Sequence, residues 1–133
     1  MNIMIIGGLG YVGRHLAQQL LIMGYSVTII DKQKNQSVID SLNKFILFDN
    51  QVLEYHQITL PSITTNMEKI VQKNKIEIVY NVIGSLSTPH ATSYMTKFLY
   101  CLLTRYTGIK YYIQSGFMED IYGYSYSKQM KCS

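Results

Sequence analysis

The chain has 133 residues, the length of one ordinary domain, which argues against a two-domain enzyme. Hydrophobic residues make up 47% of it, too many for a disordered chain, whereas charged residues make up only 15%, against roughly 25% in an average domain. The formal net charge of +4 is spread along the sequence and gives little support to nucleic-acid or membrane binding.

Short apolar runs alternate with helical stretches along the chain, a pattern typical of an α/β domain with a parallel sheet. Residues 3–6 predict a buried first strand, and apolar positions at helical spacing from Tyr11 predict a helix that Gly24 ends. The β-branched run at residues 26–30 predicts a second strand, which ends at Asp31.

The middle of the chain continues this alternation. Residues 32–50 are mostly polar and receive no firm assignment, whereas residues 52–59 predict a third strand. Thr65 followed by Glu68 forms a capping box, which predicts that a helix starts there. Residues 76–83 are almost continuously apolar, as expected of a parallel strand covered on both faces.

The last predicted elements are a helix over residues 91–106, ended by Gly108, and a fifth strand over residues 111–114. We therefore predict a Rossmann-like three-layer α/β fold, with a parallel sheet of about five strands in the order 3-2-1-4-5. Right-handed crossovers then place the carboxyl ends of all the strands on one edge of the sheet.

A glycine-rich segment follows the first predicted strand and opens the first predicted helix. Gly7 permits the tight turn, Gly10 lets the backbone approach a pyrophosphate, and Gly13 lets the helix pack closely on the strand. Free N–H groups and the positive end of the helix dipole then face the phosphates. This loop, with Tyr11 and Val12, is predicted to bind a dinucleotide; a merely flexible strand–helix turn is the alternative.

Asp31 lies at the end of the second predicted strand, roughly twenty residues beyond the glycines, as a dinucleotide site requires. A carboxylate there accepts both ribose hydroxyls of the adenosine half and repels a 2′-phosphate, so the sequence favours NAD over NADP. Lys32 is expected at the same cofactor edge, and Arg14, Lys32 and Lys34 could soften that preference. A solvated turn aspartate is the alternative.

A second group of residues that could carry chemistry lies near the end of the sequence. Ser115 follows the fifth predicted strand, and Tyr124 and Lys128 are four residues apart, which places them on one face of a helix. An ammonium near a phenol lowers the phenol pKa from about 10, which makes it usable as a proton carrier near neutrality. In a chain with 12 tyrosines, a chance match is the alternative.

Taken together, these residues resemble the short-chain dehydrogenase/reductase superfamily, and within it the extended, NAD-dependent epimerase/dehydratase branch that acts largely on nucleotide sugars. The spacing of Gly7, Gly10 and Gly13 is that branch's form. Residues 81–84, ending at Gly84, are similar to the small-residue strand end that lies against the cofactor. Residues 108–116 resemble the strand that carries the catalytic serine.

The resemblance implies a role for each residue of the C-terminal group. Tyr124 would be the catalytic acid/base, Lys128 would bind the nicotinamide ribose and tune Tyr124, and Ser115 would orient the substrate. Tyr122 and Tyr126 are rival catalytic tyrosines if the register differs. Residues 1–133 would then form one NAD(P)-binding domain, with NAD as the cofactor and a nucleotide sugar as the possible substrate.

Three departures from the family pattern leave other functions open. Only residues 116–123 separate the predicted serine from the predicted tyrosine, and Thr59 and Leu60 stand where an aspartate commonly contacts the adenine. The sequence also stops inside the helix expected to carry the tyrosine, so we expect the substrate domain to be absent. The chain could therefore be a hydride-transferring enzyme, a non-catalytic dinucleotide-binding module acting through a homodimer or protein partner, or a fragment without an independent role.

Other functional classes find little support in the sequence. Three histidines are scattered without ligand spacing, so no metal site is predicted, and two cysteines are too few for a disulfide framework or structural zinc. The N-terminus lacks the pattern of a signal peptide, and the longest uncharged stretch is interrupted too often to span a membrane. We expect a cytoplasmic protein.

Overall fold

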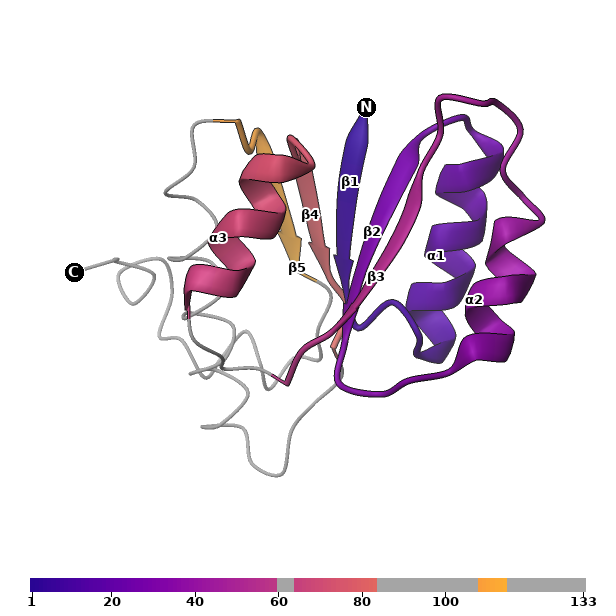
Figure 1. Ribbon diagram of the computed structural model, residues 1–133, viewed down its shortest axis with the longest axis horizontal. Helices are drawn as coiled ribbons and strands as arrows, with labels where there is room; N and C mark the ends of the chain where they lie inside the picture. Colours follow the sequence, from indigo (N-terminus) through magenta and orange to yellow (C-terminus); the bar gives the residue numbers. More distant parts are fainter. Residues whose placement is uncertain (60–63, 84–107, 115–133) are drawn as a thin grey trace.

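The computed structural model describes residues 1–59, 64–83 and 108–114 (Figure 1). The helix predicted over residues 91–106 lies outside these ranges. In chain order, the described elements are β1 (Asn2–Ile6), α1 (Tyr11–Ile22), β2 (Ser26–Asp31), α2 (Gln36–Asn43), β3 (Leu53–Gln57), α3 (Thr64–Lys73), β4 (Ile78–Asn81) and β5 (Tyr111–Gln114).

The five strands form one parallel sheet in the order β3-β2-β1-β4-β5, which confirms the predicted topology. β1 lies at the centre, where Ile3 pairs with Val27 of β2 on one side and with Ile78 of β4 on the other. Since every strand runs the same way, the carboxyl ends of all five meet at one edge, and there the β1–α1 loop begins.

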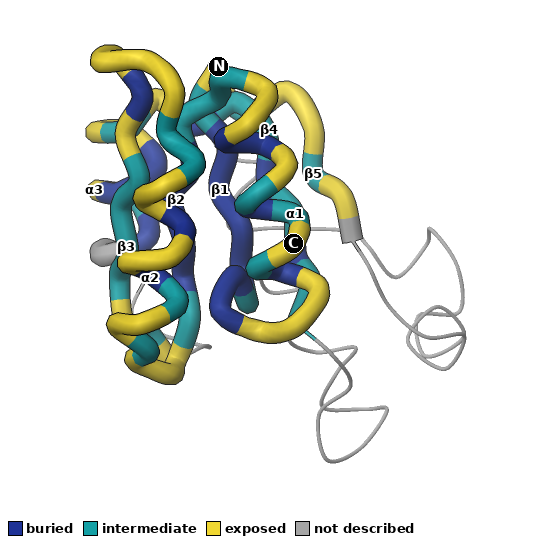
Figure 2. Tube along the Cα trace, turned by 90° about the vertical axis from the view of Figure 1, so that its right-hand side faces the viewer, coloured by how far each residue is buried: buried dark blue, intermediate teal, exposed yellow. Residues whose placement is uncertain are grey.

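Helices cover both faces of the sheet: α1 and α2 lie on one side and α3 lies on the other (Figure 1). Alternate residues of β1 point to opposite faces, and all are buried except the first, which explains why the strand is apolar throughout. Figure 2 shows the central strands as buried, with the exposed residues gathered on the helices and loops. The cluster under α1 and α2 contains Ile3, Ile5, Leu9, Ala17, Leu20, Leu21, Val27, Ile29, Ile39 and Leu42. The cluster under α3 contains Met4, Ile6, Ile30, Met67, Ile70, Val71, Ile76 and Val79.

The unassigned region of the sequence contains the helix α2. Asn35 caps it, because the Asn35 Oδ1 atom accepts a hydrogen bond from the Val38 N–H at 3.3 Å. Ile39 and Leu42 bury its inner face. The asparagine cap and the apolar spacing were both visible in the sequence, but a helix of eight residues gives too short a pattern for a firm prediction.

The bounds of three predicted elements change in the structure. α3 begins at Thr64, one residue before the predicted cap. β4 begins at Ile78 instead of residue 76, because the Ile76 N–H donates to the Val71 carbonyl and closes the end of α3. Lys75, with φ of 50°, makes the turn between them. β3 is likewise shorter than the predicted strand, ending at Gln57.

Gln51 organises the loop at the opposite edge of the sheet, where the strands begin. Its buried amide donates to the Leu21 and Tyr25 carbonyls at 2.8 and 2.9 Å. Its oxygen accepts from the Leu47 and Phe48 N–H groups at 2.8 and 2.9 Å. One side chain thus satisfies four backbone groups and ties the loop before β3 to the end of α1.

Within the described ranges, no helix is long and apolar enough to cross a membrane.

Candidate functional site

The glycine loop between β1 and α1 begins with a turn that needs glycine. Gly7 has φ of 88°, in the left-handed region that side chains rarely adopt. Its N–H donates to the Ile30 carbonyl at 2.7 Å, which joins the loop to the end of β2. A Cβ atom on Gly7 would also lie 3.1 Å from the backbone nitrogen of Ile83, beyond β4.

Gly13 and Gly10 are needed for different reasons. A Cβ atom on Gly13 would lie 2.2 Å from the Gly7 carbonyl oxygen and 2.7 Å from the Gly8 Cα atom, so only glycine lets α1 approach the loop this closely. A Cβ atom on Gly10 would meet the Gly7 oxygen alone, at 3.4 Å. Gly10 therefore faces open space, and its side of the loop is the one that a ligand can approach.

The first turn of α1 presents backbone donors at this open side. Gly10 caps the helix without a side chain, and the first turn holds no acidic residue that would compete for its N–H groups. The Arg14 N–H makes a hydrogen bond to the Gly10 carbonyl at 2.9 Å, so the N–H groups before it have no acceptor within the helix. Tyr11 and Val12 are exposed here, with exposed fractions of 77% and 57%. Such a helix end attracts anions.

Asp31 lies beside the glycine loop, where the sequence placed it. Its Oδ2 atom accepts from the Leu9 N–H at 3.0 Å, and its Oδ1 atom accepts from the Gln33 N–H at 3.0 Å. A carboxylate offers about four acceptor positions, so each oxygen of Asp31 can accept a further bond. Those remaining positions suit the two neighbouring hydroxyls of a ribose.

The cations near the loop have different roles in the structure. The Arg14 Nη2 atom donates to the Leu9 carbonyl at 3.0 Å, so this guanidinium supports the loop from within. Lys32 and Lys34 are exposed in the β2–α2 connection, which follows Asp31 in the sequence.

Two further residues shape this edge: sequence reasoning missed Gly8, and it included Asn81 only as part of residues 81–84. A Cβ atom on Gly8 would lie 2.6 Å from the Ile29 Cγ2 atom, so Gly8 is as tightly constrained as its neighbours in the motif. The doubled glycine was its only signal. Asn81 is buried at the end of β4, where its amide donates to the Tyr112 hydroxyl at 3.0 Å and its oxygen accepts from the Ile83 N–H at 3.2 Å.

The structure thus brings together the N-terminal part of the predicted site, namely Gly7, Gly10, Tyr11, Val12, Gly13, Asp31 and Lys32. The rest of the predicted site lies outside the described residues: Gly84, Ser115, Tyr124 and Lys128, with the rivals Tyr122 and Tyr126.

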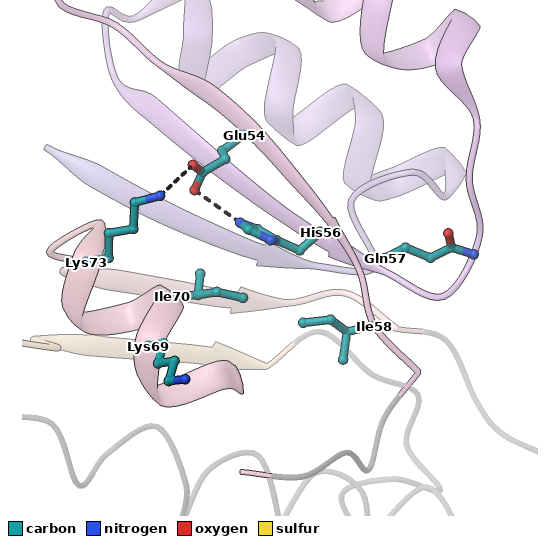
Figure 3. A pocket seen from close by; sticks show the side chains of 7 residues that line it. All are labelled: Glu54, His56, Gln57, Ile58, Lys69, Ile70 and Lys73. Atoms are coloured by element: carbon teal, nitrogen blue, oxygen red, sulfur yellow. Dashed lines mark hydrogen bonds and ion pairs between the residues drawn. The ribbon is translucent and has the colours of Figure 1, made fainter. Parts of the chain in front are cut away.

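A separate pocket of about 360 Å³ lies between β3 and α3 (Figure 3). Glu54 lines it, 3.1 Å from the His56 Nε2 atom and 3.8 Å from the Lys73 ammonium. The Asn74 amide also donates to Glu54, and this hydrogen bond is the main cause that holds the pKa of Glu54 below its ordinary value. Across the described residues, no group of three or more His, Cys, Asp or Glu side chains is arranged to hold a metal ion.

A comparison with protein families agrees with this geometry. The profile of the NAD dependent epimerase/dehydratase family matches residues 3–103. The chain belongs to this family. The match covers the glycine loop, Asp31 and four of the five strands, and it confirms the predicted family.

The chain is also similar in sequence to individual relatives, and its fold is similar to that of solved structures. The chain is 31% identical over 85 residues to UDP-glucose 4-epimerase 2 of Arabidopsis thaliana, covering 62% of this chain and 24% of that protein. The crystal structure of a Thermotoga maritima UDP-glucose 4-epimerase with UDP-glucose superposes with a TM-score of 0.63 and 21% identity, covering 86% of this chain and 37% of that one. The dTDP-glucose 4,6-dehydratase of Bacillus anthracis, in complex with NAD, gives a TM-score of 0.67 and 20% identity, covering 86% and 36%. The chain therefore spans about a quarter to a third of the length of these proteins.

Proposed function

We propose that this chain binds NAD at the glycine loop and Asp31, and that it supplies the cofactor half of an epimerase/dehydratase-type oxidoreductase. The observation that carries the proposal is the hydrogen bond between Asp31 and the Leu9 N–H. This bond holds the ribose-binding carboxylate against the loop that would hold the pyrophosphate. Membership of an NAD-dependent family supports the choice of cofactor.

The pyrophosphate and the adenosine ribose of the dinucleotide each have a fitting group among the described residues. The N–H groups at the start of α1 would hold the pyrophosphate, and the open side of Gly10 leaves room for it. Asp31 would accept the hydroxyls of the adenosine ribose. A 2′-phosphate beside that carboxylate would be repelled, which favours NAD over NADP.

When bound, NAD supplies a hydride acceptor for oxidation of a hydroxyl-bearing carbon and a hydride donor for the reverse step. In the proposed reaction Tyr124 takes the hydroxyl proton and later returns it, with Lys128 lowering its pKa and Ser115 holding the substrate oxygen. A nucleotide sugar is the substrate class that we propose, since relatives are named for UDP-glucose and dTDP-glucose.

Calorimetric titration with NAD, and in parallel with NADP, tests the binding proposal. We expect NAD to bind more tightly, and we expect Gly10→Val or Asp31→Ala to abolish binding without unfolding the chain. Asp49→Ala removes an exposed aspartate from the loop before β3, away from the glycine loop, and is the control, with unchanged affinity expected. Absence of NAD binding by a cooperatively folded wild-type chain would refute the proposal.

A second candidate is a non-catalytic dinucleotide-binding module that acts through a homodimer or a protein partner. The short sequence between Ser115 and Tyr124 favours it. It predicts NAD binding without turnover of UDP-glucose or related nucleotide sugars. Turnover that Tyr124→Phe abolishes while NAD still binds would instead establish the oxidoreductase, whereas a monomer with no captured partner would count against the module.

A further inference from the structure

The peptide between Lys32 and Gln33 links β3 to the proposed ribose site. Its N–H, on Gln33, donates to the Asp31 Oδ1 atom at 3.0 Å. Its carbonyl, on Lys32, accepts from the Gln57 Nε2 atom at 3.2 Å. A trans peptide is planar and its C=O and N–H point in opposite directions, so fixing the carbonyl also aims the N–H. Gln57 therefore helps direct the Gln33 N–H at the carboxylate of Asp31.

The following peptide is held from the same strand. The Tyr55 hydroxyl donates to the Gln33 carbonyl, and the Tyr55 ring packs on the apolar cluster under α1 and α2. Burial, and then the charge of Asp31, raise the pKa of Tyr55 above its ordinary value, so this phenol remains a donor at neutral pH. Thus two carbonyls in succession are held by side chains of β3.

Tyr55 and Gln57 can act together because they are two residues apart on one strand and so point to the same face. Figure 3 shows the Gln57 side chain pointing away from Glu54 and His56, although all three residues line the pocket between β3 and α3. The main chain is fixed as well, since the Ile58 N–H donates to the Asp31 carbonyl at 2.9 Å. The strand next to Asp31 therefore determines the course of the chain just beyond it.

We propose that Tyr55 and Gln57 are positioning residues that set the preference of the ribose site for NAD over NADP by holding the Lys32–Gln33 peptide against Asp31. This inference rests on the proposed NAD binding. The carboxylate is held on one side by the Leu9 N–H and on the other by the Gln33 N–H. If the second contact loosens, the carboxylate turns more freely, and the exposed Lys32 and Lys34 can approach a 2′-phosphate.

Tyr55→Phe and Gln57→Leu test the inference, because each removes a donor while keeping most of the side-chain volume. Gln57 is exposed, so its replacement spares the core. Tyr25→Phe is the matched control: Tyr25 packs against the same apolar cluster but precedes β2, at the opposite edge of the sheet. Dissociation constants for NAD are measured by calorimetry and those for NADP by displacement of NAD, below the melting midpoint of every variant.

A typical hydrogen bond contributes about 0.5–1.5 kcal/mol, so we expect each β3 variant to bind NAD roughly two- to twelvefold more weakly. The ratio of the NADP and NAD dissociation constants should fall by a similar factor, and Tyr25→Phe should change neither quantity. A loss of equal size for both cofactors, with the ratio unchanged, would overturn the inference, as would wild-type values in both variants. If the wild-type chain binds no NAD, the proposed function fails first and the inference falls with it.

Discussion

At the scale of single residues, Gly10 and Gly13 belong to the same motif but should respond differently to substitution. Gly13→Ala places a Cβ atom 2.2 Å from the Gly7 oxygen, a backbone atom that cannot move aside cheaply. Overpacking of this kind costs about 1–3 kcal/mol or more, so we expect a clear drop in the free energy of unfolding in urea. Gly10→Ala makes only an ordinary contact at 3.4 Å and serves as the control. Equal stability of the two variants would contradict this interpretation of the loop.

The range of a residue's contacts decides whether its role in the site can be predicted from the sequence. Gly7, Gly13 and Asp31 could be predicted because their constraints are local: a positive φ, a close helix approach and a fixed place at the end of a strand. Gly8, Tyr55 and Gln57 could not, because their roles depend on partners from other elements. Gly8 packs on Ile29 of β2, and Gln57 reaches a carbonyl 25 residues away in the sequence.

At the scale of elements, the strands were predicted more securely than the helices between them. β1, β2 and β5 carry apolar or β-branched runs that leave little choice of structure. α2 depends on one asparagine cap and a few apolar positions, and the end of α3 depends on a backbone bond from Ile76 to Val71. These contacts are local, but the end of α3 also needs a positive φ at Lys75, a conformation that favours glycine and that a lysine does not reveal in the sequence.

Glu54 couples β3 to α3, and this contact should make stability depend on pH. The Asn74 amide donates both to Glu54 and to the Thr28 hydroxyl, the latter at 3.0 Å, and so joins the end of α3 to β2 and β3. The hydrogen bond from Asn74 is the main cause that holds the pKa of Glu54 below its ordinary value. Burial opposes this effect, whereas the contacts with His56 and Lys73 lower the pKa further. A carboxyl whose pKa is lower in the folded state than in the unfolded state stabilises the fold at pH values above the unfolded pKa. This contribution is lost as the pH falls through the folded-state pKa.

We therefore expect Glu54→Gln to remove part of the loss of stability that the wild-type chain shows below about pH 4 to 5. Urea unfolding of both chains across this range measures the difference in unfolding free energy, which should shrink as the pH falls. Asn74→Ala removes the main cause of the depressed pKa and should reproduce part of the effect. Parallel curves for wild type and Glu54→Gln would show that Glu54 makes no such contribution.

At the scale of the whole molecule, the two edges of the sheet are held in different ways. The edge where the strands begin is tied by Gln51, whose amide satisfies four backbone groups. The edge where they end carries the glycine loop and Asp31. Gly7 donates to Ile30 of β2, and Asp31 accepts from Leu9 of the β1–α1 loop and from Gln33 of the β2–α2 connection. This second edge combines residues far apart in the sequence, so a ligand bound there would fasten several elements at once.

Hydrogen exchange should therefore show NAD acting on one edge and not on the other. An opening that releases NAD costs an extra RT ln(1 + [NAD]/Kd), about 2.7 kcal/mol at a hundredfold excess over Kd, which slows exchange roughly a hundredfold. We expect this slowing at the amides of Leu9 and Gln33, which bond to Asp31. The amides of Leu47 and Phe48 bond to Gln51 and can open locally while NAD stays bound, so their local exchange should be unchanged. Equal slowing at both edges would mean that the sheet opens only as one unit, and slowing confined to Leu47 and Phe48 would place the ligand at the wrong edge.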